Sequence, residues 1–418
     1  MQIGFPSYLL LLLTILAAVW GGRIDCVGRF LSGAVLIVIL SRLFLAGLSQ
    51  IRLSEGRRQA SFYPQLLANG LLVSFVWAGG LSFLLYNLSF GRIDNLLPGL
   101  SSNMWGMLCI GLVPAGLILQ TRSLSRIIGV DVAFRLVEFL SLSVFMTGAL
   151  ILTGLHRLSS ESMLGLWILS LTLNAAGAVI IIWLKTSIRK AISLELLRET
   201  LISGMKPFWV DFLSVLNYFM PLLFCSRFLP WHQTGMFALT LVLSEAVWRT
   251  ALFIKNRSPL AAVGSGISLR HFRRQEFSFC VRTGIWAGVF VLIVGGVLFG
   301  QVFRALFSEA WLLLFLVPGM VFHLITRLLS EMFEEGEDYF LLVSSGAIAF
   351  AVNFDLSLLL VGGLGLAGAG FTFFLTQAAM AVFYLLVYRK HEGLRTRELW
   401  TEVKTAAHRR NVAKGERQ

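Results

Sequence analysis

The chain consists of long apolar runs separated by short polar segments. About 20 apolar residues, at roughly 1.5 Å per helical residue, cross a hydrocarbon core of about 30 Å. Twelve such runs can be distinguished, at 5–22, 30–50, 65–90, 97–121, 127–153, 163–185, 208–229, 234–255, 280–300, 310–326, 339–361 and 367–388. Most connections between them are short, so consecutive helices should be antiparallel. The pattern predicts an all-α polytopic membrane protein with about 12 transmembrane helices.

The first run could be mistaken for a signal peptide. Residues 1–4 hold no Lys or Arg, whereas a signal peptide has a basic segment before its apolar part. We therefore interpret 5–22 as a first membrane helix.

The basic residues of the connections alternate in number along the chain. Connections on the side of the C-terminus hold 25 Lys or Arg, and those on the other side hold 6. Cytoplasmic loops carry such an excess, so both termini are predicted to be cytoplasmic. The short outer connections leave no room for an extracytoplasmic catalytic domain.

The composition agrees with a membrane protein, since 57% of the residues are hydrophobic and 14% are charged, with a mean hydropathy of +0.79. The formal charge of +13 arises mainly from Lys and Arg residues in the connections between the apolar runs. It indicates topology and contact with anionic membrane lipids, not a nucleic-acid partner. The four widely spaced cysteines suggest neither a disulfide framework nor a metal site.

Short segments recur at a nearly constant offset. Leu40-Ser41-Arg42 matches Leu243-Ser244-Glu245, and Leu112-Val113-Pro114 matches Leu316-Val317-Pro318. Trp77-Ala78-Gly79 likewise matches Trp286-Ala287-Gly288. These matches fall in order and in equivalent helices, so we predict two pseudo-symmetric six-helix bundles. The expected division is an N-terminal bundle at 1–186, a cytoplasmic linker at 187–206, a C-terminal bundle at 207–388 and a basic cytoplasmic tail at 389–418.

Six helices per repeat give both halves the same orientation in the membrane. Transporters built in this way place the substrate at the interface of the repeats and rock one bundle against the other, giving alternating access. Pro114 and Pro318 occupy equivalent positions and are predicted helix kinks, although tolerated prolines with no part in gating are an equal alternative.

Ionisable residues inside the apolar runs are the candidates for function, because they are costly in lipid and usually face protein or water. They are Arg42, Asp131, Arg135, Glu138, Asp211, Glu245, Arg249 and Asp355. On the predicted helix 30–50, Arg42 lies near the bilayer centre and has no acid three or four residues away. We expect it to face Glu245 across a polar cavity.

The other charges have partners at helical spacing. Asp131 with Arg135 and Glu245 with Arg249 are four residues apart, and Arg135 with Glu138 is three apart, so each pair can meet on one helix face. Such pairs can simply ease insertion into the membrane, which is the main alternative to a functional role.

Signatures of enzymes and metal sites are missing from the sequence. It contains no GxxxxGK[ST] phosphate loop and no HExxH motif. His323, alone within a helix, is expected to be packed or water-bonded. The sequence predicts no enzymatic activity, no metal and no cofactor.

The chain resembles the polysaccharide exporters, or O-antigen type oligosaccharide-lipid flippases, of the multidrug and polysaccharide exporter superfamily. The resemblance covers about residues 20–390. It depends on Gly28-x-Phe30 before Gly47-Leu48, on Pro318-Gly319, and on Val352-Asn353-Phe354-Asp355 followed by the glycine-rich segment 363–370. The first helix lacks the basic lead-in that is usual in that family.

The resemblance implies a secondary transporter that flips a lipid-linked oligosaccharide for polysaccharide biosynthesis, working beside glycan polymerases or glycosyltransferases. Arg42, Arg135 and Arg249 would bind its phosphates, since a guanidinium is a multidentate phosphate ligand. Glu245, Asp131 and Asp355 are candidates for coupling or gating. Amides that could meet sugar hydroxyls are Asn69, Asn103, Asn174, Asn217 and Gln377. The alternatives are a cation-coupled multidrug exporter on the same scaffold and a membrane glycan polymerase or ligase.

Overall fold

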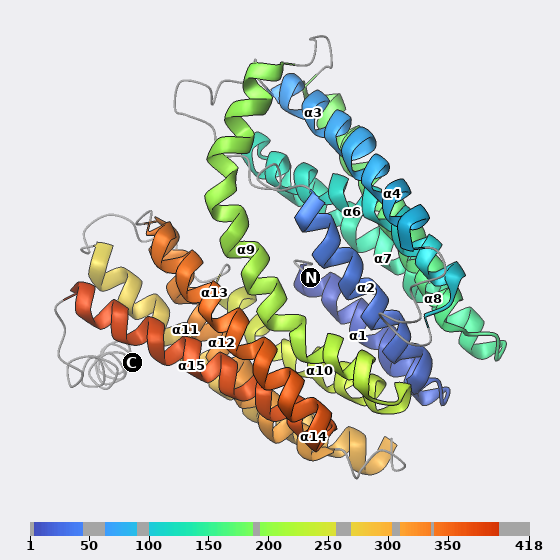
Figure 1. The fold of residues 1–418 in the computed structure, drawn as a ribbon, viewed down its shortest axis with the longest axis vertical. Helices are drawn as coiled ribbons and strands as arrows, with labels where there is room; N and C mark the ends of the chain where they lie inside the picture. Colours follow the sequence, from blue (N-terminus) through green and yellow to red (C-terminus); the bar gives the residue numbers. More distant parts are fainter. Residues whose placement is uncertain are drawn as a thin grey trace, which may run out of the picture. The chain divides into compact units, whose positions relative to one another are not determined.

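The computed structural model describes residues 4–44, 63–89, 100–186, 193–255, 269–302, 310–335 and 338–392, and their regular secondary structure is entirely helical (Figure 1). Eleven of the described segments are long and apolar enough to cross a membrane. The first helix, α1, is shorter, with 16 residues. The predicted all-α polytopic class is therefore confirmed. The predicted tail after residue 392 lies outside the described residues.

The helices follow the twelve apolar runs in order. They are α1 (Phe5–Trp20), α2 (Ile24–Phe44), α3 (Tyr63–Leu72) with α4 (Gly79–Ser89), α6 (Ser102–Ile128), α7 (Asp131–Gly154), α8 (Ser160–Thr186), α9 (Leu194–Phe228), α10 (Trp231–Lys255), α11 (Leu269–Val297), α12 (Leu313–Glu335), α13 (Tyr339–Leu356) with α14 (Gly362–Leu364), and α15 (Leu366–Glu392). Short π-helical segments continue three of them: η3 (Val73–Ala78), η5 (Leu298–Val302) and η7 (Ser357–Val361).

Several helices extend beyond the apolar runs that predicted them. Helix α9 begins at Leu194, inside the expected linker, where Ser193 caps it by accepting a hydrogen bond from the backbone N–H of Leu196. Helix α12 continues to Glu335 through a segment expected to be a loop. Leu, Glu, Arg and Lys all favour helices, so a helix persists after the hydropathy has fallen.

Pro114 and Pro318 both lie inside continuous helices, α6 and α12. A proline there lacks the N–H that would bond to the preceding turn, and the surrounding helix continues across it. A role of these prolines in gating stays a prediction.

The chain divides into two compact units. Unit 1 comprises Met1–Leu239 and Tyr339–Ala369, and unit 2 comprises Thr240–Asp338 and Gly370–Gln418. Within unit 1, α6 packs against α2 and α8, α7 packs against α1 and α8, and α13 lies along α9 (Figure 1). The division into bundles 1–186 and 207–388 stays a prediction drawn from the internal repeat.

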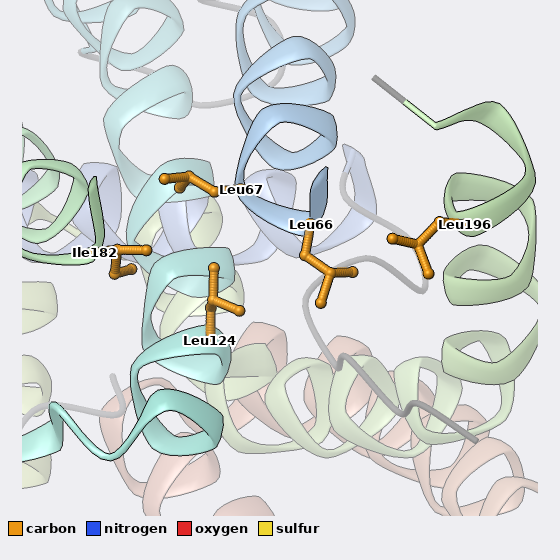
Figure 2. Packing of buried hydrophobic residues seen from close by; sticks show 5 residues of the cluster. All are labelled: Leu66, Leu67, Leu124, Ile182 and Leu196. Carbon is orange, nitrogen blue, oxygen red and sulfur yellow. The ribbon is translucent and has the colours of Figure 1, made fainter. Parts of the chain in front are cut away.

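The core of unit 1 contains an aliphatic cluster where four helices meet. Figure 2 shows its side chains, which are all at most 5% exposed and are Leu66, Leu67, Leu124, Ile182 and Leu196. Leu196 comes from the first turn of α9, and the other residues come from α3, α6 and α8. The start of α9 is thereby held against the N-terminal helices by apolar packing.

Two glycines let α2 approach the beginning of α10 within unit 1. A Cβ on Gly28 would lie 2.8 Å from the carbonyl oxygen of Trp231, and one on Gly235 would overlap the carbonyl oxygen of Ile24. Since the obstructing atoms are backbone, neither position accepts a side chain without moving a helix.

Unit 2 has its own packed interior. A Cβ on Gly319 of α12 would lie 2.8 Å from Cδ1 of Phe373 on α15, so the ring occupies the space that a side chain would need. On α11, a Cβ added to Gly288 would come within 3.2 Å of Val317. The helices of this unit are therefore closely packed around α12.

Candidate functional site

Arg42 and Asp211 form an ion pair between two helices of unit 1. Nε of Arg42 lies 2.6 Å from Oδ2 of Asp211, and it donates a hydrogen bond to that oxygen. The arginine is 3% exposed, whereas the aspartate side chain is 22% exposed. A buried arginine is costly without a counter-charge, and α9 supplies one to α2.

The beginning of the helix that carries Arg42 differs from the sequence-based prediction. We expected a helix over 30–50 with Arg42 near its middle. Helix α2 begins earlier, at Ile24, and Arg42 lies in the last turn of its described part. Residues 45–50 lie outside the described residues. The structure pairs Arg42 with Asp211 within unit 1. The expected position of Glu245, in unit 2, across a polar cavity from Arg42 stays a prediction.

Glu245 and Arg249 form the buried pair that their spacing predicts on α10, in unit 2. Nη2 of Arg249 lies 2.6 Å from Oε2 of Glu245, and the side chains are 4% and 8% exposed respectively. The guanidinium carbon of Arg249 also lies 4.5 Å from the ring centroid of Trp248. Arg327 of α12 lies 4.8 Å from the same centroid. Two guanidinium groups thus share one indole as a cation–π partner.

A polar pair, His323 with Gln377, lies beside this indole. Nδ1 of His323 lies 3.1 Å from Oε1 of Gln377 on α15, and the imidazole packs edge-on to Trp248. Both residues are at least nine-tenths buried. Gln377, a predicted partner of sugar hydroxyls, therefore bonds to His323. The indole N–H of Trp248 and the hydroxyls of Thr326 and Thr376 are buried without a hydrogen-bond partner among the described residues.

The charges continue toward the C-terminal ends of α10 and α12. Nζ of Lys255 lies 3.3 Å from Oε2 of Glu331 and 3.7 Å from Oε1 of Glu276. Arg327 approaches Glu331 at 3.8 Å, one turn away on α12. These contacts connect α10, α11 and α12 by alternating positive and negative groups.

The three ionisable residues predicted to lie together on α7, Asp131, Arg135 and Glu138, belong to two separate ion pairs. Arg135 pairs with Asp131 at 2.6 Å as expected, but its side chain is 58% exposed. Glu138 is buried and contacts Arg122 of α6 at 3.3 Å, and it also accepts a hydrogen bond from the backbone N–H of Gly4. The expected contact of Arg135 with Glu138 gives way to this pair, because Glu138 points toward α6 and the beginning of α1.

The candidate amides mostly connect helices. Asn69 donates to the carbonyl of Ser193 and accepts from its N–H, at 2.9 and 3.1 Å. Asn217 donates to the carbonyl of Gly346, and Asn353 donates to the carbonyl of Asn217. Single amides frequently cross-link membrane helices in this way.

The other predicted residues, Asn103, Asp355 and Asn174, have no described contact with the buried ion pairs. Asn103 and Asp355 are exposed. Oδ1 of Asn174 is buried and has no hydrogen-bond partner among the described residues.

A cavity of about 20 Å³ lies within unit 1, between α3, α6 and α9. Asn69, Gln120 and Thr200 contribute its polar lining. Nε2 of Gln120 is buried without a partner among the described residues. This volume suffices for about one water molecule, which could accept that hydrogen bond.

Sequence reasoning overlooked Arg122, Arg327 and Trp248. Both arginines follow apolar runs, and we counted them as loop charges, whereas the structure places them inside α6 and α12. The spacing of Arg327 to Glu331, four residues on, is a signal that could have revealed a helical position. Arg122 has no such signal, because its partner Glu138 lies on another helix. Trp248 gave no signal, since an aromatic residue in an apolar helix usually packs against lipid or neighbouring helices.

The described residues form ion pairs but no metal-ligand cluster. Within the described ranges, no three His, Cys, Asp or Glu residues are grouped as a metal site. The buried arginines Arg42 and Arg249 are each paired with a carboxylate, of Asp211 and Glu245 respectively.

Comparison with known proteins identifies the architecture. No protein-family model matches the sequence, and no curated protein matches it significantly. Solved structures do match. An inward-facing multidrug resistance MATE family transporter of the MOP superfamily aligns with a TM-score of 0.64 at 14% identity, over 94% of this chain and 95% of the other.

The lipid II flippase MurJ, in an inward closed conformation, aligns with a TM-score of 0.58 at 14% identity, over 95% of this chain and 88% of that one. The eukaryotic MATE transporter AtDTX14 aligns with a TM-score of 0.51 at 16% identity, over 97% and 95%. These proteins are transporters and a flippase. The chain is therefore a multi-pass membrane protein with the fold of MOP superfamily transporters.

Proposed function

We propose that this chain is a secondary transporter that flips a lipid-linked oligosaccharide, carried on polyprenyl pyrophosphate, from the cytoplasmic to the outer leaflet of a bacterial inner membrane. The observation that carries the proposal is the buried Arg42 bound through Nε to Asp211. This contact engages one edge of the guanidinium. Its two Nη groups are the fork that suits phosphate oxygens.

Arg249 supports the same assignment, because it is also buried and paired with one carboxylate. Arg135 is exposed at the beginning of α7, where it could meet the phosphate before entry. The likeness to a lipid II flippase supports a lipid-linked substrate for this chain. Glycan polymerases or glycosyltransferases would be the functional partners.

The energy source would be an ion gradient or the supply of substrate, because the sequence has no phosphate loop for ATP. Glu245 is the preferred coupling residue, since a carboxylate that is 6% exposed changes its interactions strongly when its charge changes. Asp131 and Asp355, which lie at more accessible positions, receive no coupling role. A direct contact of Arg42 with Glu245 is not proposed, because each residue is paired within its own unit.

A cation-coupled multidrug exporter is the second candidate, favoured by the likeness to a multidrug resistance MATE transporter. Asp211 and Glu245 are each paired with an arginine. A guanidinium has hydrogen-bond donors and no acceptor, so the groups beside these acids suit an anion and repel a cation. We therefore rank this function second.

Reconstituted vesicles would test the proposal. Purified protein is inserted into liposomes that contain a fluorescent polyprenyl-pyrophosphate disaccharide, and flipping is measured without nucleotide as the fraction protected from an external quencher. We expect flipping by the wild type, none by Arg42→Gln at equal insertion, and partial recovery by Arg42→Lys. Wild-type rates in Arg42→Gln, or transport of ethidium in place of the glycolipid, would contradict the proposal.

A further inference from the structure

We propose that Asp211 is an internal counter-ion that the substrate displaces from Arg42, so that the Arg42–Asp211 pair closes the empty site and an incoming phosphate opens it. This inference rests on the proposed function, because it requires a phosphate ligand at Arg42. It assigns to Asp211 a role in positioning and in controlling access, and no chemical step.

The unequal burial of the two side chains determines which of them moves. The side chain of Arg42 is 4% exposed and that of Asp211 is 22% exposed. A carboxylate that already borders accessible space regains water when it is displaced, whereas the buried guanidinium must keep an anionic partner. Exchange of one anion for another at Arg42 therefore costs less than removal of the arginine from its site.

The position of the pair between two helices connects this exchange to a structural change. Glu245 and Arg249 lie on the same helix, so breaking their ion pair would remove no contact between helices. Arg42 and Asp211 tie α2 to α9, which also pack against each other. Displacement of Asp211 would thus loosen the contact between α2 and α9.

A proline interrupts the backbone hydrogen bonding of helix α9 close to Asp211. Pro207 lies one turn before it inside the helix, and a proline cannot donate the hydrogen bond to the residue four positions earlier. The backbone there can adjust more easily than in an uninterrupted helix. The segment that carries Asp211 is thereby suited to move when its ion pair opens.

This arrangement predicts a particular effect on affinity. Arg42 is available to phosphate only while Asp211 is away, and apparent affinity falls in proportion to the available fraction. If the pair is open about one-tenth of the time, removal of the carboxylate tightens phosphate binding roughly tenfold. Removal of a carboxylate that merely supports the fold would leave binding unchanged or weaker.

The experiment measures the binding of farnesyl pyrophosphate to the full-length protein in detergent by titration calorimetry. We expect Asp211→Asn to bind about tenfold more tightly than the wild type. Asp211→Glu, which keeps the competing charge, should stay close to the wild type, and Arg42→Gln should bind much more weakly. Asp25→Asn, which removes an exposed carboxylate from the same helix as Arg42, serves as the matched control and should show no change.

The outcomes separate the two proposals. Weaker binding by Arg42→Gln without tighter binding by Asp211→Asn overturns the exchange and leaves the phosphate site intact. Unchanged binding by Arg42→Gln overturns the phosphate site and with it the proposed function.

A measurement on the wild type keeps the test valid if Asp211→Asn fails to fold. An infrared difference spectrum with farnesyl pyrophosphate should show a carboxylate stretch shifting from an ion-paired to a hydrated frequency, assigned to residue 211 by its displacement in Asp211→Glu. No shift of that band on binding would overturn the exchange.

Discussion

Glu245 and Arg249 lie one turn apart on α10, and Nη2 of the arginine approaches Oε2 of the glutamate to 2.6 Å inside unit 2. The contact follows from helical geometry, because side chains four residues apart share a face. Both side chains are buried. Neither charge can be left alone without a large desolvation penalty, so the pair behaves as one unit.

Glu245→Gln should therefore destabilise the protein more than removal of both charges. The single change leaves Arg249 buried without its counter-charge, and we expect the free energy of unfolding to fall by about 3–5 kcal/mol. The double change Glu245→Leu with Arg249→Met should be near neutral in stability. Denaturant titration in mixed micelles measures both variants, and equal losses in the two would show that the pair does not act as a unit.

Asn69→Ala should loosen the beginning of α9. Asn69 makes two hydrogen bonds to the backbone of Ser193, and their loss exposes unpaired groups at a helix terminus, at a cost of about 1–3 kcal/mol. Hydrogen exchange of the amides in the first turn of α9 should accelerate. The matched control is Asn87→Ala, since Asn87 donates a hydrogen bond to the carbonyl of Phe83 on its own helix. Equal protection of the first turn in both variants would contradict this role.

Gly235→Ala should destabilise unit 1, because the new Cβ would overlap the carbonyl oxygen of Ile24. Overpacking of this kind typically costs about 1–3 kcal/mol. The control is Gly165→Ala on α8, where a Cβ would meet no atom within 4 Å. That change should stabilise the helix by up to about 1 kcal/mol. Thermal unfolding in detergent compares them, and similar midpoints would exclude a close approach of α2 and α10.

The membrane orientation can be tested by single cysteines in a background without the four native ones. Gly363→Cys should react with an impermeant thiol reagent applied to intact cells, because the loop bias places the turn before α15 outside. Leu194→Cys, exposed at the beginning of α9, should react only after permeabilisation. Reversed labelling would invert the topology and the proposed direction of transport.

The sequence by itself determined the all-helical membrane class, the twelve segments and the two intrahelical ion pairs. These features depend on local properties. Hydropathy over about 20 residues determines insertion, and the helical repeat brings residues four apart together. The pairs Asp131–Arg135 and Glu245–Arg249 were predicted for this reason.

Only the tertiary structure decided the partners that lie far apart in the chain. Arg42 forms an ion pair with Asp211, and Glu138 forms one with Arg122. Glu138 also accepts a hydrogen bond from the N–H of Gly4. The order of residues along a helix does not specify how that helix is rotated against its neighbours. Rotation is determined by packing, as at Gly28 and Gly235, where backbone approach determines which faces meet. The candidate site depends on such contacts between helices. The sequence therefore predicted its arginines, but it did not predict that Asp211 is the counter-charge of Arg42.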